Sequence, residues 1–126
     1  MSFPFSLPAM IAFPPASLVR QVPPGECPED WYRHHPQALA QAFAKAKSTG
    51  ASLLLAPTAG GNAACLAEFG LENSKKEINL ELMRLAKEAA APLGLPVGGM
   101  LGPTGRFVPP LGEEDFDDIY ELYREQ

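Results

Sequence analysis

One stretch, residues 51–71, constrains the fold of this chain more than any other. It opens with a short apolar run at residues 52–56, which is typical of a buried strand. Pro57 ends the strand, Gly60-Gly61 forms a turn, and a helical segment follows over residues 62–70. In α/β proteins, ligands bind beyond the carboxyl ends of strands that lead into such turns. The stretch therefore predicts an α/β fold with a candidate site at this turn.

The segments around this stretch alternate between strand and helix patterns. Along the chain they are a weak strand at residues 9–13, a helix at 36–47, the strand at 52–56, a helix at 75–91, a strand at 95–101 and a helix at 113–126. Alternation of this kind is typical of parallel βαβ units. We predict one incomplete α/β domain over residues 1–126, with an irregular segment at 1–35 and a helix–strand–helix–strand–helix order at 36–126.

Two of the predicted helices carry apolar stripes at helical spacing. The stripe of the longer helix is Ile78, Leu82, Leu85 and Ala89, behind a capping-box pattern that begins at Ser74. The stripe of the last helix is Phe116, Ile119, Tyr120 and Tyr123. We expect both stripes to be buried and the acidic residues of the last helix to face solvent, with a docking surface for a basic partner as the alternative.

Charge and composition exclude several classes of protein. The net charge of −5 argues against a surface that binds nucleic acid or anionic membranes. Prolines interrupt the apolar residues 3–13 and no basic segment precedes them, so they predict neither a signal peptide nor a membrane span. Two cysteines, Cys27 and Cys65, do not make a disulfide framework. We expect a reducing cytoplasm.

The length limits how the predicted sheet can be completed. Strands that are apolar on both faces need helices on both sides or closure into a barrel. A (β/α)₈ barrel takes about 250 residues, and this chain has 126. About three βα units with a parallel sheet would leave an unpaired edge on each side, which favours association. We therefore predict a partial (β/α)₈ TIM barrel that self-associates or pairs with a complementary chain.

Several short motifs follow one another in a fixed order. They are Pro-Pro-Gly-Glu-Cys-Pro-Glu at residues 23–29, His-Pro at 35–36, Gly-Gly-Asn at 60–62, Leu-Ala-Glu-Phe-Gly-Leu at 66–71, Glu-Ile-Asn at 77–79, Gly-Pro-Thr-Gly at 102–105 and Pro-Leu-Gly at 110–112. In this order they resemble the N-terminal part of the homocysteine S-methyltransferase domain, most closely that of bacterial cobalamin-dependent methionine synthases. The resemblance covers residues 23–126.

The resemblance implies both a fold and an activity. Members of the family are (β/α)₈ barrels that transfer a methyl group to the thiol of homocysteine, in methionine biosynthesis. A Zn²⁺ ion held by three cysteines lowers the pKa of that thiol, and the methyl donor is often methyl-cobalamin. By resemblance, the residues expected to line the substrate end of the barrel are Thr58, Gly60, Asn62, Gly102 and Thr104.

The sequence departs from the family pattern in three places. The family's zinc cysteines come from later strands, and Cys27 and Cys65 do not match them. The first-strand motif Asp-Gly-Ala-Met-Gly-Thr is Leu-Pro-Ala-Met-Ile-Ala at residues 7–12, and the second-strand motif Thr-Asn-Thr-Phe is Ala-Pro-Thr-Ala at residues 56–59. We expect no catalytic residue, metal or cofactor in this chain alone, and activity only when further barrel segments supply the zinc cysteines. The alternative is a non-catalytic scaffold or assembly module.

Each of three features could have either a functional or a purely structural role. His34 and His35 suggest a metal, but adjacent residues on an extended chain point apart, which favours a helix-entry segment. Cys65 could be a nucleophile at a helix start, or a small buried hydrophobe, which we favour. The Gly60-Gly61 turn could bind a carboxylate through backbone N–H groups, or serve backbone geometry alone.

Overall fold

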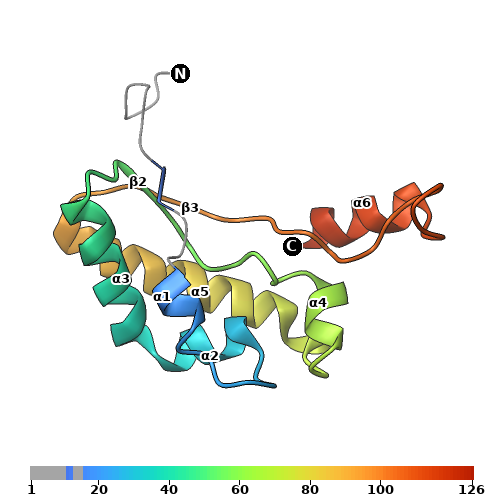
Figure 1. The fold of residues 1–126 in the computed structure, drawn as a ribbon, viewed down its shortest axis with the longest axis horizontal. Helices are drawn as coiled ribbons and strands as arrows, with labels where there is room; N and C mark the ends of the chain where they lie inside the picture. The colour runs from blue at the N-terminus through green and yellow to red at the C-terminus, as the bar shows by residue number, and fades with distance from the viewer. Residues whose placement is uncertain (1–10, 13–15) are drawn as a thin grey trace.

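Three short parallel strands lie side by side in the order β1–β2–β3 in the computed structural model, which describes residues 11–12 and 16–126 (Figure 1). The strands are β1 (Ile11–Ala12), β2 (Leu53–Leu55) and β3 (Val97–Gly98). Ile11 pairs with Leu53, and Leu54 pairs with Val97. The predicted parallel sheet is confirmed, although each strand is shorter than its apolar run. Residues 9, 10 and 13 of the predicted first strand lie outside the described residues.

The helices account for most of the regular secondary structure. They are α1 (Ala16–Val19), α2 (Pro28–His34), α3 (Pro36–Ser48), α4 (Ala63–Ala67), α5 (Lys75–Ala90) and α6 (Phe116–Glu125), with short 3₁₀ turns η1 (Glu72–Ser74) and η2 (Ala91–Leu93). The predicted helices at 36–47, 75–91 and 113–126 match α3, α5 and α6. α4 is shorter than predicted, and the chain turns away at Gly70, whose φ is +69°. Glycine adopts this left-handed conformation without strain.

The segment at residues 1–35 is less irregular than expected, because α1 and α2 lie within it. The sequence of α2 itself favours a helix, although the prolines before it indicate a loop. Pro28 occupies the first turn, where a missing N–H costs no hydrogen bond. Glu29 and Asp30 follow in that turn, and Arg33 lies in the last turn, so the charges complement the helix dipole.

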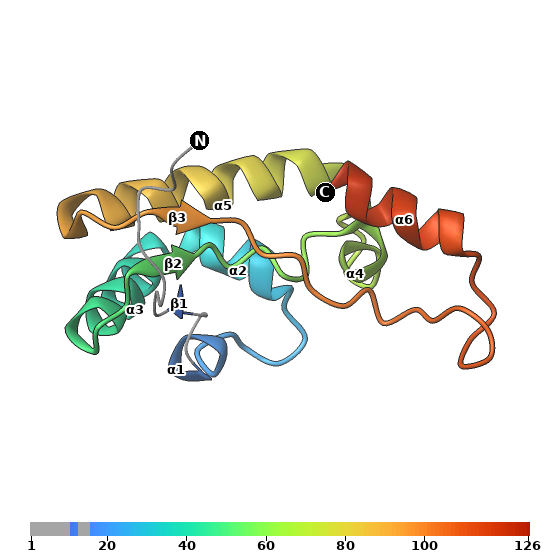
Figure 2. The same ribbon diagram turned by 90° about the horizontal axis from the view of Figure 1, so that it is seen from above.

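The core lies where α2, α3 and α5 pack on one another and on the sheet (Figures 1 and 2). Leu54 of β2 and Leu82 of α5 are fully buried, and Leu39 and Phe43 of α3 are nearly so. The neighbours of Leu54 in β2 are only half-buried, and Ile11 of β1 is exposed. The expectation that the strands are buried on both faces is therefore wrong for the described residues, since these leave the second face partly exposed.

The predicted apolar stripe of α5 is confirmed at Ile78, Leu82 and Leu85, which are buried, whereas Ala89 is half-buried. Its predicted capping box is wrong. Ser74 makes no side-chain hydrogen bond to the helix start, because the chain enters α5 directly from the 3₁₀ turn η1. The Arg84–Glu88 pair, four residues apart, forms a salt bridge of 2.7 Å on the exposed face of the helix.

Residues 101–126, which we call the arm, run away from β3 as an extended segment and return as α6 (Figure 1, orange to red). α6 buries none of its residues, and Phe116 is 70% exposed. The predicted core stripe of this helix is therefore wrong: Phe116 and Tyr120 are exposed, and Ile119 and Tyr123 are only half-buried. One ion pair, between Lys75 Nζ and Glu125 Oε2 at 2.5 Å, joins the end of α6 to α5.

Among the described residues, no helix combines the length and the apolar character that crossing a membrane requires.

Candidate functional site

The carboxyl ends of β2 and β3 are joined through one buried hydroxyl group. Thr58 Oγ1 donates a hydrogen bond to the Met100 carbonyl at 2.8 Å and accepts one from the Met100 N–H at 2.8 Å. Thr58 is only 4% exposed. Because neighbouring parallel strands end at the same edge of a sheet, this pair of bonds holds the two following loops side by side.

The Gly60-Gly61 turn rests on side chains from two helices. The Gly60 N–H donates to Glu29 Oε1 of α2 at 2.8 Å, and the Gly61 carbonyl accepts from Asn79 Nδ2 of α5 at 2.8 Å. A Cβ on Gly61 would lie 2.4 Å from Asn79 Oδ1, so a larger residue would displace this contact. The Gly60 N–H, considered above as a donor to a ligand carboxylate, is already occupied by the protein's own carboxylate.

Asn62 is fully buried at the start of α4. Its Oδ1 accepts a hydrogen bond from the Cys65 N–H at 2.9 Å, which caps the helix. Its Nδ2 donor has no hydrogen-bond partner among the described residues. Asn62 therefore offers an amide donor that the fold itself does not use.

The second glycine turn packs directly against the first loop. A Cβ on Gly102 would lie 2.5 Å from the Ala59 carbonyl oxygen, so only glycine permits this approach. Cys65 Sγ lies 3.5 Å from the Pro103 carbonyl, and Thr104 Oγ1 accepts from the Arg106 N–H at 3.2 Å. The structure thus brings together the loops that carry all five predicted site residues. The favoured interpretation, in which Cys65 is a small buried hydrophobe, is wrong, because this residue is only half-buried.

A buried carboxylate beneath the first turn was not predicted from the sequence. Glu29 is 7% exposed, and Cys27 Sγ donates to its Oε2 at 3.7 Å. Burial raises the pKa of the Cys27 thiol, against backbone hydrogen bonds that lower it, and the charge of Glu29 raises it further. Burial first, then Glu29, raises the pKa of Tyr32 to about 12. Cys27 is therefore a buried neutral thiol and a poor nucleophile.

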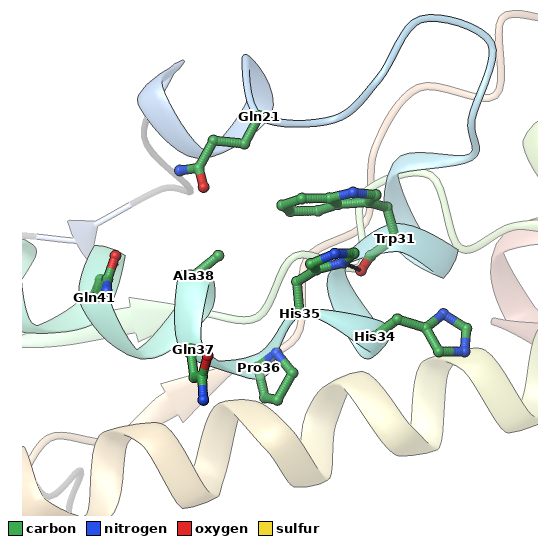
Figure 3. Close-up of a pocket in the computed structure, with 8 residues that line it drawn as sticks. All are labelled: Gln21, Trp31, His34, His35, Pro36, Gln37, Ala38 and Gln41. Atoms are coloured by element: carbon green, nitrogen blue, oxygen red, sulfur yellow. Dashed lines mark hydrogen bonds between the residues drawn. The ribbon is translucent and has the colours of Figure 1, made fainter.

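The two histidines stabilise the junction between α2 and α3, beside a cavity of about 410 Å³ (Figure 3). The His35 ring stacks on Trp31 with centroids 3.9 Å apart and planes 11° apart. His34 Nδ1 and His35 Nδ1 each lie 2.8 Å from a carbonyl oxygen one helical turn earlier. Figure 3 shows the two imidazole rings pointing apart. These contacts explain the pair as a helix junction.

A zinc site of the kind that the resemblance implies does not fit the part of the chain that the structure describes. No group of three or more His, Cys, Asp or Glu side chains there could hold a metal ion. Cys27 Sγ is directed to Glu29, whereas Cys65 Sγ faces the carbonyls of Pro103 and Thr104. The two thiols therefore belong to different environments.

Gln126, at the end of α6, is a further residue of the site that sequence reasoning missed. Its Nε2 donates to the Thr58 carbonyl at 2.6 Å and lies 3.5 Å from the Met100 carbonyl. It also lies 3.4 Å from Asn79 Oδ1. The side chain lines a cavity of about 240 Å³ together with Met83. No local pattern in the sequence could indicate a contact across 68 residues.

Comparison with known families places these loops in context. A family model for homocysteine S-methyltransferase matches residues 13–126. This chain belongs to the homocysteine S-methyltransferase family. The match spans both glycine turns and every residue of the site described above, and it confirms the family resemblance. No curated protein matches the chain. The contacts described above show how the two loops are held, and a part of the five predicted residues in binding substrate stays a prediction.

Proposed function

We propose that this chain forms the front of a (β/α)₈ S-methyltransferase barrel and holds part of the site for a homocysteine-like thiol. The observation that carries the proposal is the pair of hydrogen bonds between Thr58 and Met100, which fixes the carboxyl ends of β2 and β3 together. Family membership supports methyl transfer as the reaction class. The edge of the sheet where these loops meet is where parallel α/β folds bind their ligands.

The chemistry of the proposed reaction requires an activated thiol. In the family, as the resemblance implies, a bound Zn²⁺ ion would supply this activation by lowering the pKa of the thiol. The described residues offer no such metal site. We therefore propose that cysteines outside these 126 residues supply it, and we assign this chain only the positioning of the substrate. The buried Asn62 amide donor is one group that could serve this purpose.

Exposed apolar surface supports completion of the barrel by further segments. On the arm, Phe107 is 57% exposed, Leu111 82% and Phe116 70%. β1 and β3 are the two edges of the three-stranded sheet, and each can pair with another strand. Further βα units, whether on the same polypeptide or another, would pair with these edges and cover the apolar face of α6.

Methyl transfer to homocysteine tests the proposal directly. The purified chain with zinc and methyl-cobalamin should show no turnover. Addition of a segment that carries the three zinc cysteines should restore it. Turnover by the chain alone would contradict the assignment of the zinc ligands to other segments. A stable complex that contains zinc, binds methyl-cobalamin and still does not methylate homocysteine would contradict the proposed function.

A non-catalytic scaffold is the second candidate. It is favoured by residues 56–59, where Ala-Pro-Thr-Ala replaces the Thr-Asn-Thr-Phe motif of the family and lacks its amide and aromatic ring. A scaffold that keeps open sheet edges should self-associate or bind a fixed partner. Light scattering would distinguish the two candidates. A folded monomer at high concentration would count against the scaffold.

A further inference from the structure

Three oxygen atoms converge on one point at the carboxyl ends of β2 and β3. They are the carbonyl oxygens of Thr58 and Met100 and the Oδ1 of Asn79, at 2.6, 3.5 and 3.4 Å from Gln126 Nε2. All three are acceptors, and they come from two loops and a helix that are far apart in the sequence. The nitrogen of Gln126 is therefore held in a small cage of oxygens.

The cage does not depend on Gln126 for its shape. Both N–H groups of the Asn79 amide are used, donating to the carbonyls of Gly61 and Lys75 at 2.8 Å each. This arrangement leaves Oδ1 as the atom that faces the cage. The Thr58 hydroxyl fixes the position of Met100 by bonding to both its N–H and its carbonyl oxygen. All three acceptors are thus positioned by contacts within the body of the fold.

A carboxamide matches this cage poorly. It carries two N–H donors and one oxygen acceptor, and the Oε1 of Gln126 is buried with no hydrogen-bond partner among the described residues. A buried acceptor without a partner costs free energy. A primary ammonium group carries three N–H donors and no acceptor. It could therefore give one hydrogen bond to each oxygen and leave no group unsatisfied.

We propose that this three-oxygen cage binds the α-ammonium group of the amino-acid substrate, and that Gln126 occupies it when no substrate is present. The identity of the substrate as an amino-acid thiol rests on the proposed function. The adjoining cavity of about 240 Å³, lined also by Met83 and Leu101, provides apolar surface for the rest of a small ligand. Binding requires the Gln126 side chain to leave the cage, so the end of the arm competes with substrate.

Nearby charges are compatible with a cation in the cage. Lys75 lies near the cage, because its carbonyl oxygen accepts a hydrogen bond from the Asn79 amide. The ammonium group of Lys75 is paired with Glu125 at 2.5 Å. Glu125 precedes Gln126 directly, so the carboxylate that neutralises Lys75 lies next to the residue that fills the cage. Displacement of the Gln126 side chain alone leaves this ion pair in place, so a cation that enters the cage does not meet an uncompensated positive charge.

Nuclear magnetic resonance of the full chain can test the proposal with two probes, homocysteine and N-acetylhomocysteine. The second probe keeps the thiol and the carboxylate and lacks the ammonium group. Homocysteine should move the side-chain amide signal of Gln126 towards that of a free glutamine. It should also bind about tenfold or more tightly than the acetylated probe, because charged hydrogen bonds are lost with the ammonium.

Two variants sharpen the test. Gln126→Ala empties the cage, so homocysteine should bind about three- to tenfold more tightly as the competitor is removed. Gln126→Glu keeps the size of the side chain, but the three oxygens of the cage repel its carboxylate. This variant should therefore also open the cage. Arg124→Ala is the matched control on the same turn, since Arg124 pairs only with Glu121 in an exposed position, and it should not change the affinity.

The outcomes separate this proposal from the proposed function. Equal binding of both probes, or homocysteine binding that leaves the Gln126 signal in place, would overturn the ammonium site. So would the absence of any gain in affinity in both Gln126 variants. Norleucine, an amino acid without sulfur, provides the remaining comparison. If norleucine displaces Gln126 as well as homocysteine does, the ammonium site stands, because the zinc that would bind the thiol is assigned to other segments. Only a completed, zinc-containing complex that fails to methylate homocysteine counts against the proposed function.

Discussion

α5 and α6 carry similar sequence patterns and have opposite environments. Each has apolar residues at helical spacing and charged residues between them. Leu82 of α5 is fully buried, whereas Phe116 of α6 is 70% exposed. α5 packs against α2, α3 and the sheet, which belong to the body of the molecule, residues 16–100. The pattern determines which face of a helix is apolar, but the rest of the fold determines whether anything covers it.

The prediction with the largest expected effect replaces one leucine in the body and one in the arm. Leu82→Ala in the body should lower the free energy of unfolding by about 3 kcal/mol, because it removes buried surface and leaves a cavity. Leu111→Ala is the same substitution on the arm, where the side chain is 82% exposed. It should change stability by less than about 0.5 kcal/mol. Urea unfolding of both variants measures the difference.

A similar loss of stability in both variants would contradict the comparison. It would mean that Leu111 is buried in solution, for example in an association of chains. Repeating the Leu111→Ala measurement at several protein concentrations would detect this, because stability that comes from association depends on concentration.

The parts of the fold that depend on neighbouring residues were predictable. Pro36 and Gly50 bound α3, and the spacing of Ile78, Leu82 and Leu85 predicts the buried face of α5. α2 was missed, because the prolines before it indicate a loop and its seven residues are too few for a clear period. The exposure of α6 was missed because periodicity contains no information about the partner of an apolar face.

The sequence predicted the loops of the candidate site, but not the side chains that reach it from elsewhere in the chain. The glycines at 60–61 and 102 mark turns after strands, and the structure brings these turns together as parallel strands require. Glu29 and Gln126 could not be found in this way. Each contacts the site across 31 residues or more, and an acidic residue or a glutamine is ordinarily solvent-exposed.

The body should also respond to alkaline pH through Tyr32. Its pKa is about 12 in the folded chain, against 10.0 for an unperturbed tyrosine. The folded state keeps its proton while the unfolded state loses it, so stability should fall between about pH 10 and pH 12. The loss should be at most about 2 to 3 kcal/mol. Tyr32→Phe should remove this part of the pH dependence.

Chemical unfolding at several alkaline pH values would measure the effect, with tyrosinate absorbance to follow ionisation. Lysines and other tyrosines also titrate in this range, so the decisive quantity is the difference between the wild-type chain and Tyr32→Phe. An identical decline in both chains would show that Tyr32 ionises equally in the folded and unfolded states.

Ion pairs provide a smaller test of the two regions. In the body, Arg33 pairs with Asp30 of its own helix at 2.7 Å and joins α2 to α5 through Glu77 at 3.0 Å and Glu81 at 3.1 Å. Its side chain is 15% exposed. Burial alone would lower the pKa of Arg33, but these hydrogen bonds raise it. Arg33→Met should cost about 1 kcal/mol, less at high salt. Arg124→Met on the arm should produce no measurable change, since its pair with Glu121 is exposed.

Thermal unfolding of the two methionine variants at low and high salt would measure the contrast. If Arg124→Met destabilised the chain as much as Arg33→Met, the arm would contribute to the cooperative core and the comparison between the regions would fail.

The smallest expected effect concerns the ion pair that joins the arm to the body. A hydrogen bond from Lys75, together with its charge, lowers the pKa of Glu125 below its usual value of 4.5. The pair therefore stabilises the docked arm above about pH 4.5, and this contribution is lost as the pH falls through the lower, folded pKa. Hydrogen exchange of the α6 amides should accelerate over that range. Faster exchange of the wild-type chain in acid is not by itself evidence for this pair, and the decisive comparison is with Glu125→Gln. Glu125→Gln should begin with faster exchange and lack this component of the pH dependence, and parallel pH profiles in the two chains would show that the arm is held by something other than Lys75.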